Sequence, residues 1–131
     1  MTPERYLSKA ERALSSARLL RQDGDAEGAC NRAYYAMFDA AHAALLRHQA
    51  GVNPAETRTH SGLIGAFGKH LVKTGRVQAA LGRVLNQVER IRLLADYTGE
   101  DVEPDKVDWV IQQAVEVVDA IRRVSPSPSS S

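Results

Sequence analysis

Hydrophobic residues recur three and four positions apart along most of the chain, a spacing that predicts amphipathic helices rather than strands. The first such segment follows Thr2, a suitable N-cap, and Pro3, which suits the first helical position. We therefore expect a helix from about Pro3 to residues 21–25, with a buried stripe of Tyr6, Ala10, Ala13, Leu14, Ala17 and Leu20. The last segment begins at Pro104 and repeats Val107, Val110, Ile111, Ala114, Val118 and Ile121.

Three more helices are predicted between these two. Asp25 can cap a second helix, which we expect to continue to about His48. Thr59 can cap a short third helix that stops at Gly75, and a fourth helix is expected over about residues 77–97.

Short connections between long amphipathic helices favour an antiparallel up-and-down bundle. The predicted fold class is therefore all-α, with about five helices. We expect one helical domain over residues 1–124. The Ser- and Pro-rich residues 125–131 have nothing to bury, so we expect a disordered tail there.

The second predicted helix carries polar residues that packing alone does not require. Placed on a helical wheel, its segment "CNRAYYAMFDAAHAALL" (residues 30–46) has a broad core face that includes Tyr34, whose buried hydroxyl must find a partner. A narrower stripe beside this face consists of Asn31, Tyr35, Asp39 and His42. An internal hydrogen-bond network and one wall of a polar ligand cleft both explain this stripe.

The fourth predicted helix supplies a candidate for the opposite wall. Arg92 falls at the edge of its apolar face, and Asp96 follows one turn later. The two side chains can form a simple helix pair, or the Arg92 guanidinium can reach a phosphate or carboxylate. The last turn is apolar nearly all round, so we expect a second subunit to cover it; its apolar residues are Leu93, Leu94, Ala95 and Tyr97.

The formal net charge of +1 hides an uneven distribution along the chain. Residues 58–92 hold seven basic side chains against Glu89 alone, whereas residues 96–119 hold eight acidic side chains against Lys106 alone. Neutralisation between adjacent helices and a basic face for an anionic ligand are both open. The overall balance argues against binding to duplex DNA, which depends on many phosphate contacts.

Composition narrows the cellular setting. The single cysteine, Cys30, excludes an internal disulfide framework and is expected to be a small core residue. No apolar run reaches membrane-spanning length and the N-terminus has no signal core, so a cytoplasmic protein without membrane contact is expected. We expect no metal and no cofactor, because no metal-site spacing relates His42, His48, His60 and His70.

Three segments together resemble a prokaryotic HEPN domain, of the type paired with small nucleotidyltransferases. They are "NRAYYAMFDAAHAALL", "TRTHSGLIGAFGKHLVKTG" and "RLLADY", in this order and spacing. The resemblance covers roughly residues 3–124. It implies a helical bundle that forms a homodimer through the second and fourth helices, which carry two of these segments. It also implies genomic pairing with a nucleotidyltransferase and, in many members, metal-independent RNase activity.

The RNase signature of that family, Arg-x(4-6)-His, is incomplete in this chain. Arg92 fits the Arg, but Tyr97 stands where the His would begin and no His follows it. Cleavage needs one group to take the 2′-hydroxyl proton and another to protonate the leaving oxygen, and a Tyr with a pKa near ~10 is a poor base. Asp96 is a substitute base. His60 can either enter from another helix or serve as a capping or packing residue.

Two functions follow from this reading. The first is a toxin–antitoxin or stress-module component that binds RNA or a nucleotide in a dimer cleft, with weak or lost cleavage. Its candidate catalytic residues are Arg92, Asp96 and Tyr97, and its candidate ligand contacts are Asn31, Tyr35, His42 and His60. The second is a non-catalytic interaction module that docks a nucleotidyltransferase or another partner.

Tyr97 has a further candidate role that comes from the resemblance. In related toxins the partner enzyme adds AMP to a Tyr just beyond the signature His. Tyr97 ends its helix one residue before "TGED", where its hydroxyl can reach solvent. Packing at the dimer seam is the expected role, and modification is the alternative.

Overall fold

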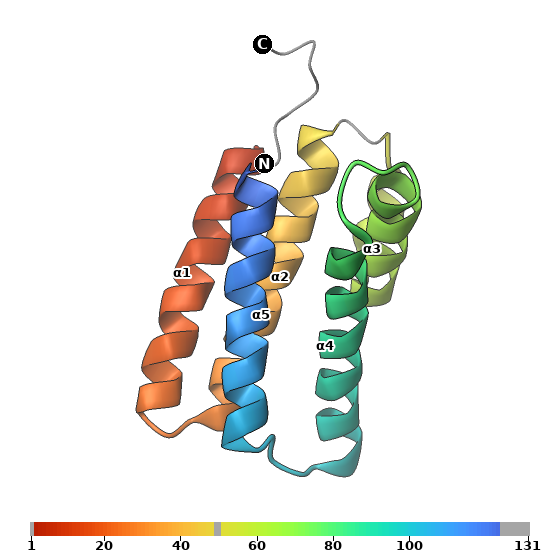
Figure 1. The fold of residues 1–131 in the computed structure, drawn as a ribbon. Helices are drawn as coiled ribbons and strands as arrows, with labels where there is room; N and C mark the ends of the chain where they lie inside the picture. The colour runs from red at the N-terminus through yellow and green to blue at the C-terminus, as the bar shows by residue number, and fades with distance from the viewer. Residues whose placement is uncertain (1, 49–50, 124–131) are drawn as a thin grey trace.

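The structure, a computed structural model, describes residues 2–48 and 51–123. Within these ranges it is entirely helical, which confirms the predicted fold class (Figure 1). The five α-helices are α1 (Pro3–Gln22), α2 (Ala26–Arg47), α3 (His60–Phe67), α4 (Ala79–Thr98) and α5 (Pro104–Arg123). Consecutive long helices run in opposite directions, as α1 and α2 do and as α4 and α5 do. The tail expected over 125–131 lies outside the described residues.

Helix α2 is the centre of the bundle and packs against each of the other four helices. Its many alanines let neighbouring helices approach closely on several sides at once. Seven of them are fully or almost fully buried: Ala29, Ala33, Ala36, Ala40, Ala41, Ala43 and Ala44. The alanines of residues 36–44, which favoured a subunit contact in the sequence, are therefore used for packing inside the subunit.

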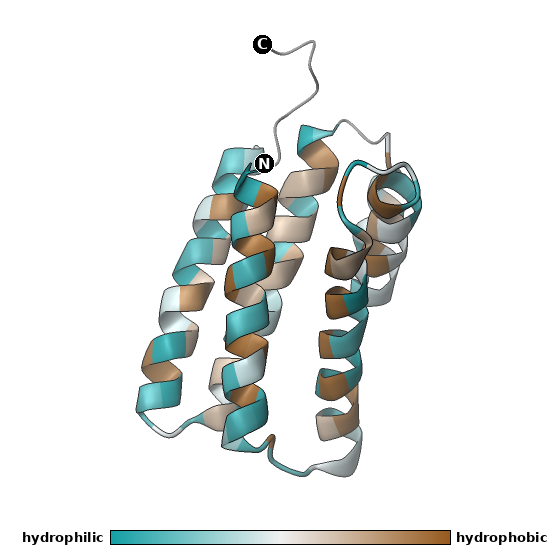
Figure 2. Ribbon diagram, viewed as in Figure 1, coloured by the Kyte–Doolittle hydropathy of each residue, from teal (hydrophilic) through white to brown (hydrophobic). Residues whose placement is uncertain are grey.

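Helix α4 lies at the edge of the bundle. Only Leu85 and Val88 of this helix are buried, and the hydrophobic positions extend to its last turns (Figure 2). Leu94 is 61% exposed and Tyr97 is 90% exposed. Gly99, in the left-handed conformation at φ 70°, ends the helix with a hydrogen bond from its N–H to the Ala95 carbonyl, close to the predicted end.

The start of α3 is fixed by two local contacts. The Thr59 side chain accepts a hydrogen bond from the Gly62 N–H at 3.0 Å, which confirms the predicted cap. A Cβ on Gly62 would collide with the Glu56 carbonyl oxygen of the 3₁₀ turn η1 (Pro54–Thr57), so this close approach requires glycine. Together these contacts determine where His60, the first residue of α3, is held.

The third helix differs from the prediction. Instead of one helix to Gly75, the α-helix ends at Phe67 and continues as a π-helical turn, η2 (Gly68–Val72). Phe67 and Leu71 are both completely buried, so the turn keeps both side chains in the core. The Leu71 carbonyl then accepts hydrogen bonds from the N–H groups of Arg76 and Val77, which closes the segment. None of the helices in 2–48 and 51–123 is long and apolar enough to cross a membrane.

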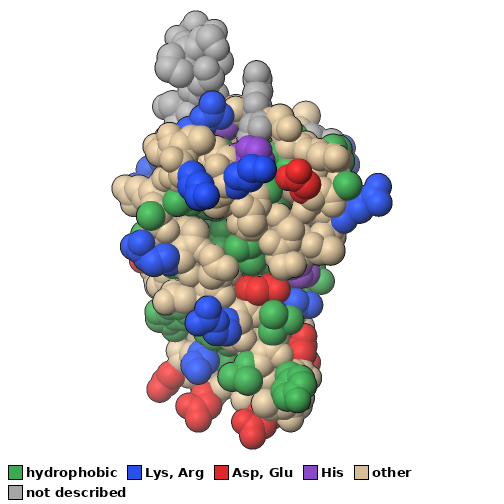
Figure 3. Space-filling view, turned by 90° about the vertical axis from the view of Figure 1, so that its right-hand side faces the viewer, with side chains coloured by type: hydrophobic (Ala, Val, Ile, Leu, Met, Phe, Trp, Pro, Cys, Tyr) green, Lys and Arg blue, Asp and Glu red, His purple; other side chains and the backbone are tan. Residues whose placement is uncertain are grey.

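The ion pairs in the described residues join α1 to α5. Arg21 pairs with Asp108 at 2.8 Å and Arg122 pairs with Glu11 at 2.9 Å. Partly exposed pairs of this kind stabilise a fold by at most about 1 kcal/mol each. Neither pair neutralises the basic segment by the acidic one. On the face that carries α3 and α4, acidic side chains gather toward the lower end and basic ones lie mainly above them (Figure 3).

Candidate functional site

Arg92 reaches from α4 to the junction of α2 and α3. Its Cζ lies 4.6 Å from the ring centroid of Tyr34, a cation–π contact. Its Nη1 lies 3.5 Å from the Tyr34 hydroxyl and 3.4 Å from Nδ1 of His60. The hydroxyl of Tyr34, which is only 1% exposed, therefore has a partner in Arg92.

Aromatic rings hold the His60 imidazole in place. It stacks on Phe38 at a centroid distance of 4.4 Å and 17° between the planes. Tyr34 and Tyr35 contact it edge-on, at centroid distances of 5.1 Å and 5.8 Å. His60 is thus fixed by residues of α2, although it belongs to α3. Tyr34 and Phe38 belong to the predicted core face, and their role in shaping the site was missed.

The contact with Arg92 determines which tautomer of His60 fits the site. A guanidinium has N–H donors and no acceptor, so Nδ1 must be the acceptor and Nε2 carries the proton of the neutral ring. Partial burial lowers the pKa of His60, and the nearby Arg92 charge lowers it further. His60 is therefore a neutral N–H donor at neutral pH. Its other nitrogen is engaged by Arg92 and is a poor proton acceptor.

The positive charge of Arg92 is not cancelled by a close carboxylate. In the described part of the chain, neither of the two ion pairs includes Arg92. Glu89, one turn earlier on α4, has a buried oxygen, Oε2, with no hydrogen-bond partner among the described residues. Burial raises the pKa of Glu89 and the Arg92 charge opposes that rise. Glu89 was not a predicted site residue; its signal in the sequence is the three-residue spacing to Arg92.

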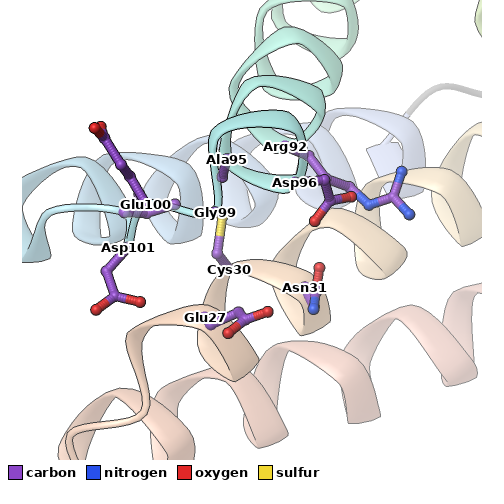
Figure 4. A pocket seen from close by; sticks show the side chains of 10 residues that line it. Glu27, Cys30, Asn31, Arg92, Ala95, Asp96, Gly99, Glu100 and Asp101 are labelled. Carbon is purple, nitrogen blue, oxygen red and sulfur yellow. The ribbon is translucent and has the colours of Figure 1, made fainter.

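A cavity of about 160 Å³ lies between α2 and α4 below Arg92. Figure 4 shows Arg92 and Asp96 on α4 above Asn31 and Glu27 on α2. The structure thus brings together the predicted site residues Arg92, Asp96 and Asn31. The cavity holds a few water molecules, at about 30 Å³ each, and is smaller than the ~300 Å³ lower limit of typical small-ligand pockets. A nucleotide would therefore lie across its mouth.

The wall of this cavity also includes Cys30. Its side chain is buried, and burial raises the pKa of the thiol, so it stays protonated as expected of a core residue. Within the described ranges, His, Cys, Asp and Glu side chains do not gather in a group of three or more that could hold a metal ion.

The polar stripe of α2 does not line one cleft. Asn31 faces the cavity under Arg92, and Tyr35 contacts His60. The His42 ring instead stacks on Tyr6 of α1 at a centroid distance of 4.9 Å, and burial lowers its pKa. Asp39 opens toward α1. Of the other predicted site residues, Tyr97 does not line the cavity and points to solvent.

The chain matches known proteins along most of its length. A sequence model described as the HEPN domain matches residues 3–124. A UPF0332 protein of Gloeobacter violaceus is 39% identical over 101 residues, which cover 76% of each chain. A UPF0332 protein of Thermotoga maritima is 35% identical over 124 residues, which cover 92% of this chain and 89% of the relative.

A third relative carries a functional name. A protein of Methanocaldococcus jannaschii named "Putative toxin" is 33% identical over 114 residues, which cover 87% of this chain and 81% of that protein. The domain match extends from the start of α1 to just beyond the end of α5. This protein therefore belongs to the HEPN domain family.

Proposed function

We propose that the protein is a component of a toxin–antitoxin or stress module that binds a phosphate of RNA or of a nucleotide through Arg92 and His60. The observation that carries this proposal is the 3.4 Å contact between Arg92 Nη1 and His60 Nδ1. It leaves the guanidinium charge and the Nε2 proton of His60 available to an anion. The "Putative toxin" name of one relative supports the biological setting.

We further propose that cleavage by this site is weak or absent. A base must remove the 2′-hydroxyl proton of RNA, and a second group must protonate the leaving oxygen. The Nδ1 of His60 is engaged by Arg92, and its lowered pKa makes it a weaker base. Asp96 is the remaining candidate base on the cavity wall. The site therefore suits binding of the phosphate better than proton transfer.

A homodimer through the end of α4 is part of the proposal. The α2 alanines are buried inside the subunit, so the apolar surface that remains is the last two turns of α4. Leu93 is 52% exposed there, next to the still more exposed Leu94 and Tyr97. A two-fold contact at this position would bring the Arg92 residues of both subunits toward one seam.

RNA binding by single-residue variants tests the proposal. Fluorescence anisotropy with a labelled single-stranded RNA should show that Arg92→Ala weakens binding at least about 10-fold, the loss expected for a charge-assisted hydrogen bond. Arg90→Ala is the matched control, because Arg90 is exposed on the same helix and faces away toward α5. Equal binding by wild type and Arg92→Ala would refute the proposal.

A specific observation also favours the docking function. A mostly apolar groove of about 600 Å³ runs between α4 and α5, and its wall includes Ile91, Leu94 and Trp109. Trp109 is 38% exposed, which is unusual for so large an apolar side chain. If a nucleotidyltransferase partner binds wild type but not Trp109→Ala, and no RNA binds, docking is the function of this chain. Exposed Tyr97 is then the residue to examine for added AMP by intact mass.

A further inference from the structure

A second cationic pocket lies on the other side of Tyr35, between α1 and α2. Lys9 and Arg12 enter it from α1, and Arg32, Tyr35 and Asp39 enter it from α2. Its volume is about 280 Å³. Three cations thus face one carboxylate, and the ion pairs of the described residues involve none of the four. A concentration of positive charge with an open side is suited to an anionic group.

Tyr35 connects this pocket to the Arg92–His60 site. The Cζ of Arg32 lies 5.0 Å from the centroid of the Tyr35 ring, and the centroid of His60 lies 5.8 Å from the same ring. Tyr35 is 38% exposed, although it belongs to the most buried helix of the bundle. The exposed part of its ring is therefore a stacking surface between two groups of cationic and N–H donors.

The carboxylate of Asp39 does not neutralise the pocket. Burial raises its pKa, and the charges of Lys9 and Arg32 oppose that rise. Lys9 also lies near His42, whose pKa its charge lowers together with that of His60. Positive charge is therefore felt along the whole edge of α2 from the α1 side to His60, with two cations in excess over Asp39 in the pocket itself.

We infer that a single strand of RNA crosses the surface from α4 to α1, with adjacent phosphates in two subsites. One phosphate lies at Arg92 and His60, the next lies in the Lys9–Arg12–Arg32 pocket, and the base between them stacks on Tyr35. This inference rests on the proposed phosphate binding at Arg92 for its first subsite. It deepens that proposal by selecting a polynucleotide over a mononucleotide. A base stacked on Tyr35 must be unpaired, so the path selects a single strand over a duplex.

Fluorescence anisotropy with a labelled single-stranded RNA of about 12 nucleotides tests the path. The double variant Arg12→Ala/Arg32→Ala should weaken binding at least about 10-fold and lower the slope of log affinity against log salt by about 1.4, which is ~0.7 per lost phosphate contact. The matched control, Arg18→Ala/Arg83→Ala, removes two exposed cations outside both subsites and should leave the affinity within about twofold.

The stacking step has its own pair of variants. Tyr35→Ala should weaken RNA binding about 5-fold or more, whereas Tyr35→Phe keeps the ring and should bind like wild type. Equal loss in the two double variants would overturn the second subsite, and equal loss in the two Tyr35 variants would overturn the stacking step.

The outcomes also separate the two proposals. If Arg92→Ala removes RNA binding while Arg12→Ala/Arg32→Ala binds like wild type, the path is wrong and phosphate binding at Arg92 stands. If wild type binds no RNA, both are wrong. Equal affinity of wild type for a duplex of the same sequence would overturn the single-strand path alone.

Discussion

Arg92 and His60 lie 32 positions apart in the chain, yet their side-chain nitrogens Nη1 and Nδ1 are 3.4 Å apart in the fold. The two residues come from α4 and from the first turn of α3, and neither helix alone places an arginine beside a histidine. The signature expected of this family is incomplete along the sequence of α4. The fold nevertheless supplies an arginine–histidine pair from two separate helices of one subunit.

The ring of Tyr34 supports this pair and its hydroxyl adds one contact. Tyr34→Phe removes the acceptor for Arg92 but keeps the cation–π contact. We expect a loss of about 0.5–1.5 kcal/mol in the free energy of unfolding, typical of one hydrogen bond, and a weaker hold on RNA. Urea unfolding and anisotropy measure the two effects. Unchanged stability and unchanged RNA binding together would show that the hydroxyl contact has no role.

The position of His60 depends on the glycine that follows it. Gly62→Ala would push the added Cβ into the Glu56 carbonyl oxygen, so we expect about 1–3 kcal/mol of destabilisation by urea unfolding. Gly65→Ala is the matched control in the same helix, because a Cβ there meets nothing within 4 Å. This control should gain about 0.5–1 kcal/mol from helix propensity. A similar effect of both substitutions would contradict the close packing of η1 on α3.

The lowered pKa of His60 predicts a pH dependence that a variant can isolate. Below pH ~6.5 the unfolded state protonates this histidine while the folded state keeps it neutral, so its contribution to stability is lost as pH falls. Asp39 and Glu89, whose pKa values are raised, act in the opposite direction. The comparison is therefore made with His60→Gln, which keeps both carboxyls. Between pH 7.5 and pH 5.5, wild type should lose more stability than this variant.

An NMR titration of the His60 imidazole checks the same point directly. A pKa at or above ~6.5 in wild type would contradict the partly buried, Arg92-contacted imidazole. In Arg92→Ala the pKa should rise but remain below the usual value, because burial is the larger cause of the shift.

The exposed end of α4 predicts a homodimer. Light scattering at micromolar concentration should give twice the 14.3 kDa mass of the chain. Leu94→Lys should yield a folded monomer, because it places a charge in an apolar contact without touching the core. Leu19→Lys is the control, since Leu19 is 66% exposed on α1. A monomeric wild type would rule out the dimer, and a dimeric Leu94→Lys would place the contact elsewhere.

Much of the fold could be predicted because its signals are local. Thr2, Asp25 and Thr59 accept hydrogen bonds from the first turns of their helices, as their positions in the sequence indicated. The π-helical turn after Phe67 could not be predicted, because the hydrophobic spacing continues across it unchanged. The role of the α2 alanines was also ambiguous, since small residues suit contacts within a subunit and between subunits equally.

The site was predictable only in part for a similar reason. Arg92 was a candidate because its place at the edge of an apolar face can be read from one helix. Its partner could not be derived, because the direction of His60 depends on the contact between Gly62 and Glu56, which a helical wheel does not contain. For the same reason the α2 stripe divided, with His42 stacked on Tyr6 and Tyr35 beside His60.

A double-mutant cycle for RNA binding tests the central claim, that Arg92 and His60 bind phosphate as a unit. The dissociation constants of wild type, Arg92→Ala, His60→Ala and the double variant are measured by anisotropy, with each variant shown to be folded by circular dichroism. Residues in contact around one ligand couple by about 0.5–3 kcal/mol, so the double variant should lose clearly less than the two single losses combined. Additive losses, or an Arg92→Ala variant that binds RNA like wild type, would contradict the claim.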